Sequence, residues 1–338
     1  MKKVFCSLLI VAMFASLMIP ALIVAQTTPQ VWVVRGPPPG VGPEPSPQEI
    51  PWGIERIYAP DAWATTNGSG VQIAVLDTGV DKDHEDLWAN IAWGISVVGD
   101  KESTIYRDWK DKNGHGTHVT GTIAALYNDI GVVGVGPEIE IYAIKVISDA
   151  GFGTWTDLAE GIEWAIKGPD GTVGTDDDAE VISMSLGGTA KSDEVEAACQ
   201  KAYDLDIVLV AAAGNEGDDG VLYPAKFSTV IAVGATAEDD SVPSWSSKGP
   251  EVELGAPGVN VLSTVPRDRY ESYSGTSMAC PHVSGTVGLM IAKIIVEGRT
   301  YNVTYIRTIL HDTAEDIGQP PEAVGYGLVR ADKAVAAA

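Results

Sequence analysis

Cysteine is scarce in this sequence, with three residues among 338. Cys6 lies in an apolar N-terminal stretch, so Cys199 and Cys280 are the two that remain in the rest of the chain. Two cysteines do not make a disulfide framework, which excludes the class of small domains that disulfides hold together. We interpret both as small buried residues rather than as a bridged pair.

Basic residues are also few. The chain has 22 lysines and arginines against 46 aspartates and glutamates, a net charge of −24. A nucleic-acid partner would require a basic stripe, so none is expected. The acidic balance is compatible with bound cations or with a surface adapted to heat or salt, although most of the carboxylates are expected simply to face solvent.

The N-terminus is the one long uncharged segment that resembles a targeting sequence. Lys2 and Lys3 precede an apolar stretch that runs to Ala25, which predicts a secretory signal peptide over residues 1–25. The stretch is long for a signal, so an uncleaved N-terminal membrane anchor is the alternative. No second apolar run of membrane length is evident in the sequence.

A linker and one large domain are predicted after this segment. Residues 26–47 include "GPPPGVGPEPSP", which is too rich in proline and glycine to pack as a core element. We interpret them as a linker or a propeptide remnant. Ordered structure is expected to begin near Gln48 and to form a single catalytic domain over residues 48–338.

The remainder alternates between strand and helix patterns, which predicts an α/β fold with a doubly wound, mostly parallel sheet covered by helices on both faces. In such a sheet, ligands bind beyond the carboxyl ends of the strands. The predicted strands are 71–79, 139–147, 179–188, 206–215, 229–235 and 259–264, and the predicted helices are 115–126, 157–167, 192–204 and 277–296.

Four polar residues stand at these strand ends and helix starts. Asp77 follows the first strand in "LDTGVD", and His115 lies between glycines in "NGHGTHVTG". Asn215 ends a strand in "AAAGNEG", and Ser277 begins the long apolar helix in "YSGTSMACPH". Taken singly, each has an ordinary structural interpretation, such as a turn cap. His118 could pair with His115 on a metal, but no third ligand occurs at zinc spacing.

Together the four residues supply the parts of a hydrolytic site. A serine hydroxyl needs a base to remove its proton, and the base needs a partner that fixes its tautomer. Ser277, His115 and Asp77 fill these roles in the chain order Asp–His–Ser, which is one of the orders in which the triad occurs. The amide of Asn215 could donate to an oxyanion.

These motifs resemble those of the subtilisin-like serine proteases. The resemblance runs from Gln48 to Ala338 and is carried by "LDTGVD", "NGHGTHVTGTIAAL", "SMSLGG", "AAAGNEG", "YPAKF" and "YSGTSMACPHVSG", and less specifically by "GYGLVRADKAV". The acidic insert before "SMSLGG" is similar to that of the archaeal, heat-adapted branch. The resemblance implies the triad Asp77, His115 and Ser277, with Asn215 and the backbone N–H of Ser277 as oxyanion donors.

The resemblance also implies where substrate binds. The segment 149–155 would pair with extended substrate, and Trp155 would wall an apolar pocket. Recognition by strand addition reads backbone more than side chains, so broad specificity is expected. The implied substrate-binding residues are Gly151, Gly153, Trp155, Ser185, Leu186, Gly187, Ala211, Ala212, Gly214 and Glu216.

A structural calcium ion is the implied cofactor. The resemblance gives side-chain ligands at Gln48, Asp86 and Asn128 and backbone carbonyl ligands at Leu126, Ile130 and Val132. Six oxygens suit Ca²⁺. The acidic insert has further aspartates at ligand-like spacing, for which a solvated loop is an equal alternative: Asp170, Asp176, Asp177 and Asp178.

The resulting hypothesis is a secreted, monomeric, calcium-stabilised serine endopeptidase that acts on polypeptides with a broad, apolar preference. Because Glu216 would lie at the rim of the pocket, a processing enzyme that cleaves after basic residues is the alternative specificity. A different class, a secreted binding protein on the same fold, would have no need of all four site residues. Family members usually carry a longer folding propeptide than the roughly twenty residues present here, so the chain is expected to fold unaided, to use a separate chaperone, or to be truncated.

Overall fold

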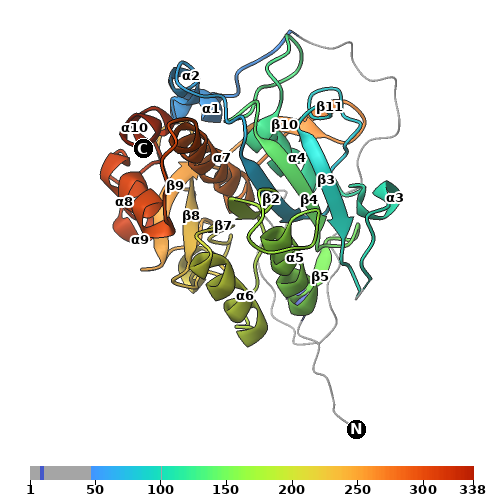
Figure 1. Ribbon diagram of the computed structural model, residues 1–338. Coiled ribbons are helices and arrows are strands. Elements are labelled where there is room, and N and C mark those ends of the chain that lie inside the picture. Colours follow the sequence, from blue (N-terminus) through green and yellow to red (C-terminus); the bar gives the residue numbers. More distant parts are fainter. Residues whose placement is uncertain (1–7, 11–46, 100) are drawn as a thin grey trace.

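The computed structural model describes residues 8–10, 47–99 and 101–338 (Figure 1). Most of the predicted signal segment and linker lies outside these residues. The strands are β1 Leu8–Ile10, β2 Gln72–Asp77, β3 Ile91–Ser96, β4 Glu140–Lys145, β5 Phe152–Thr154, β6 Val181–Met184, β7 Val208–Ala212, β8 Val230–Thr236, β9 Val252–Pro257, β10 Val261–Val265 and β11 Arg269–Tyr273. The helices are α1 Trp52–Arg56, α2 Ala59–Ala62, α3 Tyr106–Trp109, α4 His115–Ala124, α5 Trp155–Lys167, α6 Asp193–Asp204, α7 Thr276–Val296, α8 Val303–Thr313, α9 Pro321–Val324 and α10 Ala331–Ala337, with a 3₁₀ turn at Gly217–Asp219.

Seven strands form the central sheet in the order β3-β4-β2-β6-β7-β8-β9, and every neighbouring pair is parallel. The chain adds strands on one side of β2 first and then continues from β6 on the other side. The direction of winding therefore reverses at β2, and a crevice for ligand is expected beyond the carboxyl ends of β2 and its neighbours. This arrangement confirms the predicted fold class.

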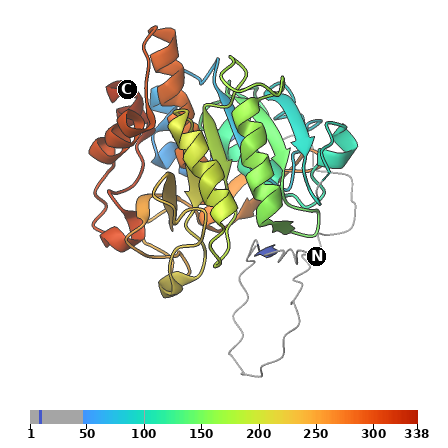
Figure 2. The ribbon, with the colours of Figure 1, turned by 60° about the horizontal axis from the view of Figure 1, so that its bottom comes forward.

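Helices cover both faces of the sheet (Figures 1 and 2). Successive side chains of a strand point to opposite faces. Accordingly, Ile73 and Val75 of β2 join a cluster with α4 and α7, whereas Ala74 and Leu76 join a second cluster with α5 and α6. Because both faces are buried, the strands are apolar throughout, which is why the sequence shows continuous apolar runs rather than alternation.

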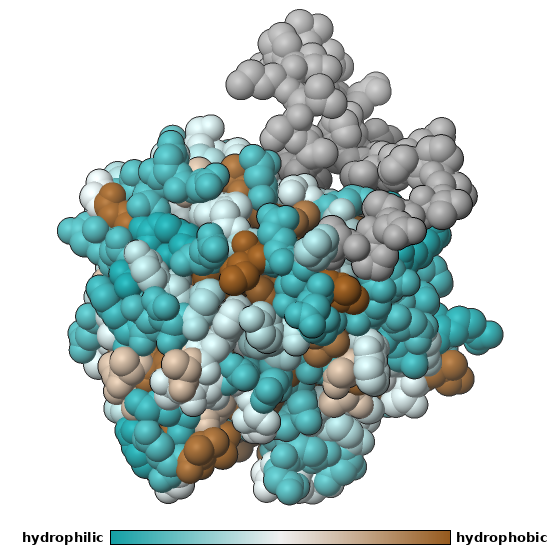
Figure 3. Space-filling model, turned by 90° about the horizontal axis from the view of Figure 1, so that it is seen from above, coloured by the Kyte–Doolittle hydropathy of each residue, from teal (hydrophilic) through white to brown (hydrophobic). Residues whose placement is uncertain are grey.

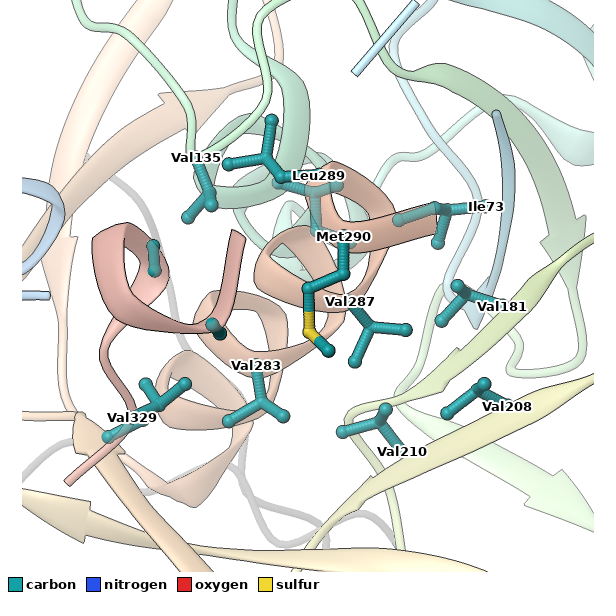
Figure 4. Close-up of a cluster of buried hydrophobic side chains, with 14 of the residues drawn as sticks. Ile73, Val135, Val181, Val208, Val210, Val283, Val287, Leu289, Met290 and Val329 are labelled. Carbon is teal, nitrogen blue, oxygen red and sulfur yellow. The ribbon is translucent and has the colours of Figure 1, made fainter. Parts of the chain in front are cut away.

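Helix α7 is the centre of the first cluster. Val283 and Val287 lie over Val208 and Val210 of β7, with Met290 beside them (Figure 4). Burial of each such side chain stabilises the fold by about 1.5–3 kcal/mol. Among the described residues α7 is the one helix whose length and composition would suit a membrane span, but 83% of its apolar window is buried inside the protein. It is a core helix by that measure.

Capping residues explain where helix α5 begins. The hydroxyl of Thr154 accepts a hydrogen bond from the backbone N–H of Asp157 at 3.0 Å, and the Asp157 carboxylate accepts one from the Thr154 N–H at 3.2 Å. This reciprocal pair is a capping box, which satisfies two backbone donors that the first turn leaves free. The helix therefore starts at Trp155, two residues before the predicted start at 157.

One predicted strand belongs elsewhere. Residues 259–264 were expected in the parallel sheet, but β10 pairs antiparallel with β11 in a separate two-stranded ribbon. The prediction of its sheet partner was wrong because a short apolar run does not indicate which strand it pairs with. Strands β3 and β9, which the pattern did not reveal, complete the edges of the main sheet.

The remaining cysteines are both free and buried, as expected. Cys280 packs in the cluster under α7 and Cys199 in the cluster under α6, on opposite faces of the sheet. Burial raises the pKa of the Cys280 thiol to about 11 and that of Cys199 to about 12.

The described surface seen from above is mostly hydrophilic, with small separate apolar patches (Figure 3).

Candidate active site

A buried carboxylate–imidazole pair lies at the carboxyl end of the central strand. Asp77 is the last residue of β2 and His115 the first residue of α4. His115 Nδ1 lies 2.8 Å and 2.9 Å from the two carboxylate oxygens of Asp77, and both residues are buried. Burial disfavours the charged imidazolium, but the facing carboxylate outweighs it and raises the pKa of His115 above its ordinary value of 6.5.

The start of α4 is held in place by a second buried carboxylate. Asp111 accepts hydrogen bonds from the N–H of Gly114, from the N–H and hydroxyl of Thr117, and from the hydroxyl of Thr78. The Thr78 hydroxyl in turn accepts from the N–H of Gly116 at 2.9 Å. These bonds satisfy backbone donors at the helix N-terminus and fix the imidazole relative to β2.

Ser277 occupies the first turn of α7, which packs against α4. Its backbone N–H is one of the donors that have no partner inside the helix, and the positive end of the helix dipole favours negative charge there. The Ser277 hydroxyl donates to the carbonyl of Ser185 at 3.1 Å, while the Ser185 hydroxyl donates to the carbonyl of Ser277 at 2.7 Å. This reciprocal pair ties the helix start to the end of β6.

The side-chain amide of Asn215 lies beside the serine. Its oxygen accepts hydrogen bonds from the backbone N–H of Thr276 at 2.9 Å and from the Thr276 hydroxyl at 3.1 Å. The same hydroxyl accepts from the N–H of Gly214 at 3.1 Å. Thr276 thus holds the side-chain oxygen of Asn215, and Asn215 lines the same pocket as Ser277.

That pocket is small. Its walls come from the ends of β6 and β7 and from the start of α7, and its free volume is about 20 Å³, little more than one water molecule needs. The lining residues are Leu186, Gly187, Ala212, Gly214, Asn215, Glu216, Leu222, Thr276 and Ser277. Of the predicted wall residues, Ser185 and Ala211 do not line it, because Ser185 bonds the helix start and Ala211 packs in the cluster under α5 and α6.

The edge of β5 accepts an extended segment. Residues Leu8–Ile10 pair antiparallel with it, with Leu9 opposite Gly153. Gly151 has a φ of +85°, a conformation that favours glycine, and turns the chain into this edge. Trp155, expected to wall a pocket, is 4% exposed and packs in the cluster with Leu158.

His118 is structural. It is fully buried, its ring stacks on Tyr273 at 4.3 Å, and its Nε2 lies within hydrogen-bond distance of the carbonyls of Val261 and Glu271. Burial lowers its pKa to about 3. Among the described residues no group of three or more His, Cys, Asp or Glu side chains could hold a metal, so a His115–His118 metal pair has no third ligand there.

The predicted calcium ligands converge around the loop after α4. The amide nitrogen of Gln48 lies 2.6 Å from the carbonyl of Leu126, 3.1 Å from that of Val132 and 3.4 Å from the Asn128 side-chain oxygen. One carboxylate oxygen of Asp86 accepts from the N–H of Val132, and the other is buried without a hydrogen-bond partner. Burial raises the pKa of Asp86 to about 7. A group of carbonyl and side-chain oxygens that includes an unpartnered buried carboxylate oxygen fits a hard cation.

Ile130, the remaining predicted calcium ligand, and the aspartates of the acidic insert make other contacts. Ile130 lies in the same loop and donates its N–H to the Asn128 side chain at 3.2 Å. In the insert, Asp177 and Asp178 accept backbone N–H groups of Asp170 and Gly174, so they act as turn caps. Asp176 is exposed.

A parallel sheet with a buried Asp–His pair at its carboxyl edge, and with a serine in the first turn of a helix that packs against α4, is typical of a serine hydrolase. Comparison with known proteins identifies the family of serine hydrolases. The subtilase family matches residues 68–327. The chain is 44% identical over 288 residues to "Thermostable alkaline protease" of Halalkalibacterium halodurans, covering 85% of this chain and 74% of that protein.

Two further relatives are covered almost completely. "Subtilisin Savinase" of Lederbergia lenta is 43% identical over 288 residues, which cover 85% of this chain and 99% of that protein. "Subtilisin DY" of Bacillus licheniformis is 42% identical over 293 residues, with the same two coverages. The chain therefore belongs to the subtilase family and is a serine endopeptidase of the subtilisin type.

Three residues near the site were not singled out from the sequence. Thr276 precedes the predicted nucleophile directly and orients Asn215. Asp111 lies four residues before His115 and holds the start of α4. Leu222 also lines the pocket, although it lies outside the motifs that supply the other lining residues. The first two were visible as polar residues beside a motif, but nothing local to Leu222 marks it.

Proposed function

We propose that the chain cleaves peptide bonds of extended polypeptides through an acyl-enzyme formed on Ser277, with His115 as general base and Asp77 as its positioning partner. The observation that carries the proposal is the buried contact of 2.8 Å between Asp77 and His115 at the carboxyl edge of the sheet. A histidine held this way presents its other nitrogen, Nε2, away from the carboxylate.

The reaction then proceeds in two halves. His115 Nε2 takes the proton of the Ser277 hydroxyl as its oxygen attacks the scissile carbonyl, and the resulting imidazolium gives that proton to the leaving amine. A water molecule, deprotonated in turn by His115, attacks the acyl carbon, and the proton returns to the Ser277 oxygen. The Asn215 amide and the Ser277 N–H donate to the oxyanion in both halves.

The Ser277 hydroxyl must turn from the carbonyl of Ser185 for this to happen. Rotation about one side-chain bond redirects it, and such contacts commonly tighten only when substrate is bound. The packing of α4 against α7 supports this step, because His115 and Ser277 both lie in the first turns of these helices.

Substrate is proposed to bind as an added strand on β5. The antiparallel pairing of residues 8–10 with this strand supports the idea, because an extended segment pairs there with the same strand edge. Recognition through Gly151 and Gly153 would read main chain and leave sequence selectivity to the pocket. We keep the broad, apolar preference as the leading expectation and basic-site processing, through Glu216, as the second candidate.

Calcium is proposed to stabilise the fold through Gln48, Asp86, Leu126, Asn128, Ile130 and Val132. A bound ion would supply positive charge to the buried Asp86 carboxylate and tie the N-terminal arm to the domain. Residues Asp170, Asp176, Asp177 and Asp178 are a weaker candidate, because those of the insert that make contacts are engaged as turn caps. Secretion after removal of residues 1–25, and a monomeric state, complete the proposal.

Hydrolysis of a peptide p-nitroanilide by wild type and Ser277→Ala tests the function. Loss of the nucleophile should reduce turnover on the order of 10⁶-fold while circular dichroism stays unchanged. Ser284→Ala is the matched control, because it alters another buried serine further along α7. This variant should keep turnover within a few-fold. If Ser277→Ala were folded and retained more than a trace of activity, the assignment of the nucleophile would be wrong.

A further inference from the structure

We propose that Leu222 sets the depth of the pocket beside Ser277 and restricts the residue before the scissile bond to a small side chain. The inference rests on the proposed function and deepens it, since it names the substrate class. It narrows the broad apolar preference to residues of about the size of alanine.

The side chain of Leu222 lies between the two glycine-lined walls. A Cβ placed on Gly187 would lie 2.9 Å from Leu222 Cβ, and one placed on Gly214 would lie 2.7 Å from Leu222 Cγ. Gly187 follows β6 and Gly214 follows β7, so one isobutyl group contacts both walls. Leu222 therefore occupies the space between the two walls.

The position of this leucine is fixed by its backbone. The N–H of Leu222 donates to the carbonyl of Ala213 at 2.8 Å, and its carbonyl accepts from the N–H of Lys226 at 2.9 Å. The adjacent residue Tyr223 exchanges two backbone hydrogen bonds of 2.9 Å with Gly188. The segment is therefore attached to both walls, and the side chain cannot leave the pocket without breaking these bonds or adopting another rotamer against the glycines.

Leu222 is buried, but it lies outside the large hydrophobic clusters. It is 9% exposed, yet it belongs to none of the three hydrophobic clusters formed by the described residues. Its apolar surface faces the pocket, where the remaining volume is about 20 Å³. A methyl group fits such a space, whereas a phenyl ring or a lysine side chain requires several times more.

The test is a set of succinyl-Ala-Ala-Pro-X p-nitroanilides with X as Ala, Leu, Phe or Lys, assayed with wild type, Leu222→Ala and Leu222→Gly. Wild type should prefer Ala over Phe by at least tenfold in kcat/KM, and Leu222→Gly should shift that ratio at least a hundredfold toward Phe, with Leu222→Ala between them. A single methylene already changes discrimination about 10–200-fold. The ratio is measured within one preparation, so partial unfolding of a variant does not affect it.

Two controls isolate the cause. Leu222→Ile keeps the volume and should keep the ratio, and Leu205→Ala truncates an exposed leucine outside the pocket and should leave it unchanged. Efficient cleavage after Phe by wild type, or an unchanged ratio in Leu222→Gly, would overturn the inference. A protein that cleaved none of the substrates would instead contradict the proposed function, so the two failures are distinct. Preferential cleavage after Lys by wild type would likewise overturn it in favour of Glu216.

Discussion

The imidazole of His115 combines burial with a carboxylate contact, and these act on its pKa in opposite directions. Burial favours the neutral ring, whereas Asp77 at 2.8 Å favours the charged one, and the net effect raises the pKa. A base of this kind is useful at neutral to alkaline pH because it is neutral before the reaction and strongly stabilised once it has taken the proton.

Activity is therefore expected to rise with pH as His115 loses its proton, because only the neutral ring accepts the proton of Ser277. In Asp77→Asn the charge that raises the pKa is gone, so the acid limb should move to lower pH and turnover should fall about 10⁴-fold. The measurement is kcat/KM between pH 4 and 9. An acid limb at the same pH in both proteins would contradict the role given to Asp77.

At the scale of elements, the beginning of α7 depends on one threonine. The Thr276 hydroxyl bridges the Asn215 side chain and the N–H of Gly214, so the helix start and the end of β7 share it. Thr276 thereby fixes the side chain of Asn215 in the absence of substrate. In the proposed role of oxyanion donor, an Asn215 amide held in this way would need no rearrangement during the reaction.

Thr276→Val should reduce kcat by about 3–10-fold, the effect of one lost hydrogen bond on the orientation of Asn215, with KM little changed. Thr286→Val is the matched control, because that hydroxyl is also buried on α7 but bonds to the carbonyl of His282, remote from the pocket. The measurement is kcat and KM of both variants by steady-state kinetics. Equal losses of kcat in the two variants would mean that the effect is a general one of helix stability.

Elements also show what the sequence could and could not predict. The long apolar runs of β2, β6, β7 and β8 indicated a buried parallel sheet, and the residues that follow them were correctly placed at its carboxyl edge. The strand that pairs with β10 was not predictable, because strand pairing depends on tertiary contacts. Likewise, the floor of the pocket depends on contacts of Leu222 with Gly187 and Gly214, which lie 35 and 8 positions away. Local patterns carry no information on such contacts.

At the scale of the whole molecule, the excess of acidic residues and the loop around Asp86 belong together. A net charge of −24 destabilises a compact state by self-repulsion. A cation held by Gln48, Asp86 and the loop 126–132 would relieve that repulsion locally and join segments that are far apart in the chain. Binding to the native state alone stabilises it by about 2.7 kcal/mol at a hundredfold excess over Kd.

Residues 48–338 are accordingly expected to refold to active enzyme in millimolar calcium without an added propeptide and to lose thermal stability in chelator. Asp86→Ala should abolish the calcium dependence, and Asp176→Ala, in the acidic insert, should keep it. Refolding yield and Tm, each with calcium and with chelator, are the measurements. Yields independent of calcium in wild type would show that the loop has no such role.

The central claim, that Ser277 is made nucleophilic by the buried Asp77–His115 pair, is tested most directly by covalent labelling. A fluorophosphonate probe should react with one serine per native chain, and peptide mass spectrometry should locate the adduct at Ser277. Labelling should disappear in Ser277→Ala and after unfolding, and it should slow by orders of magnitude in His115→Ala, because no base then removes the proton. An unlabelled native protein, or an adduct on another serine, would contradict the account.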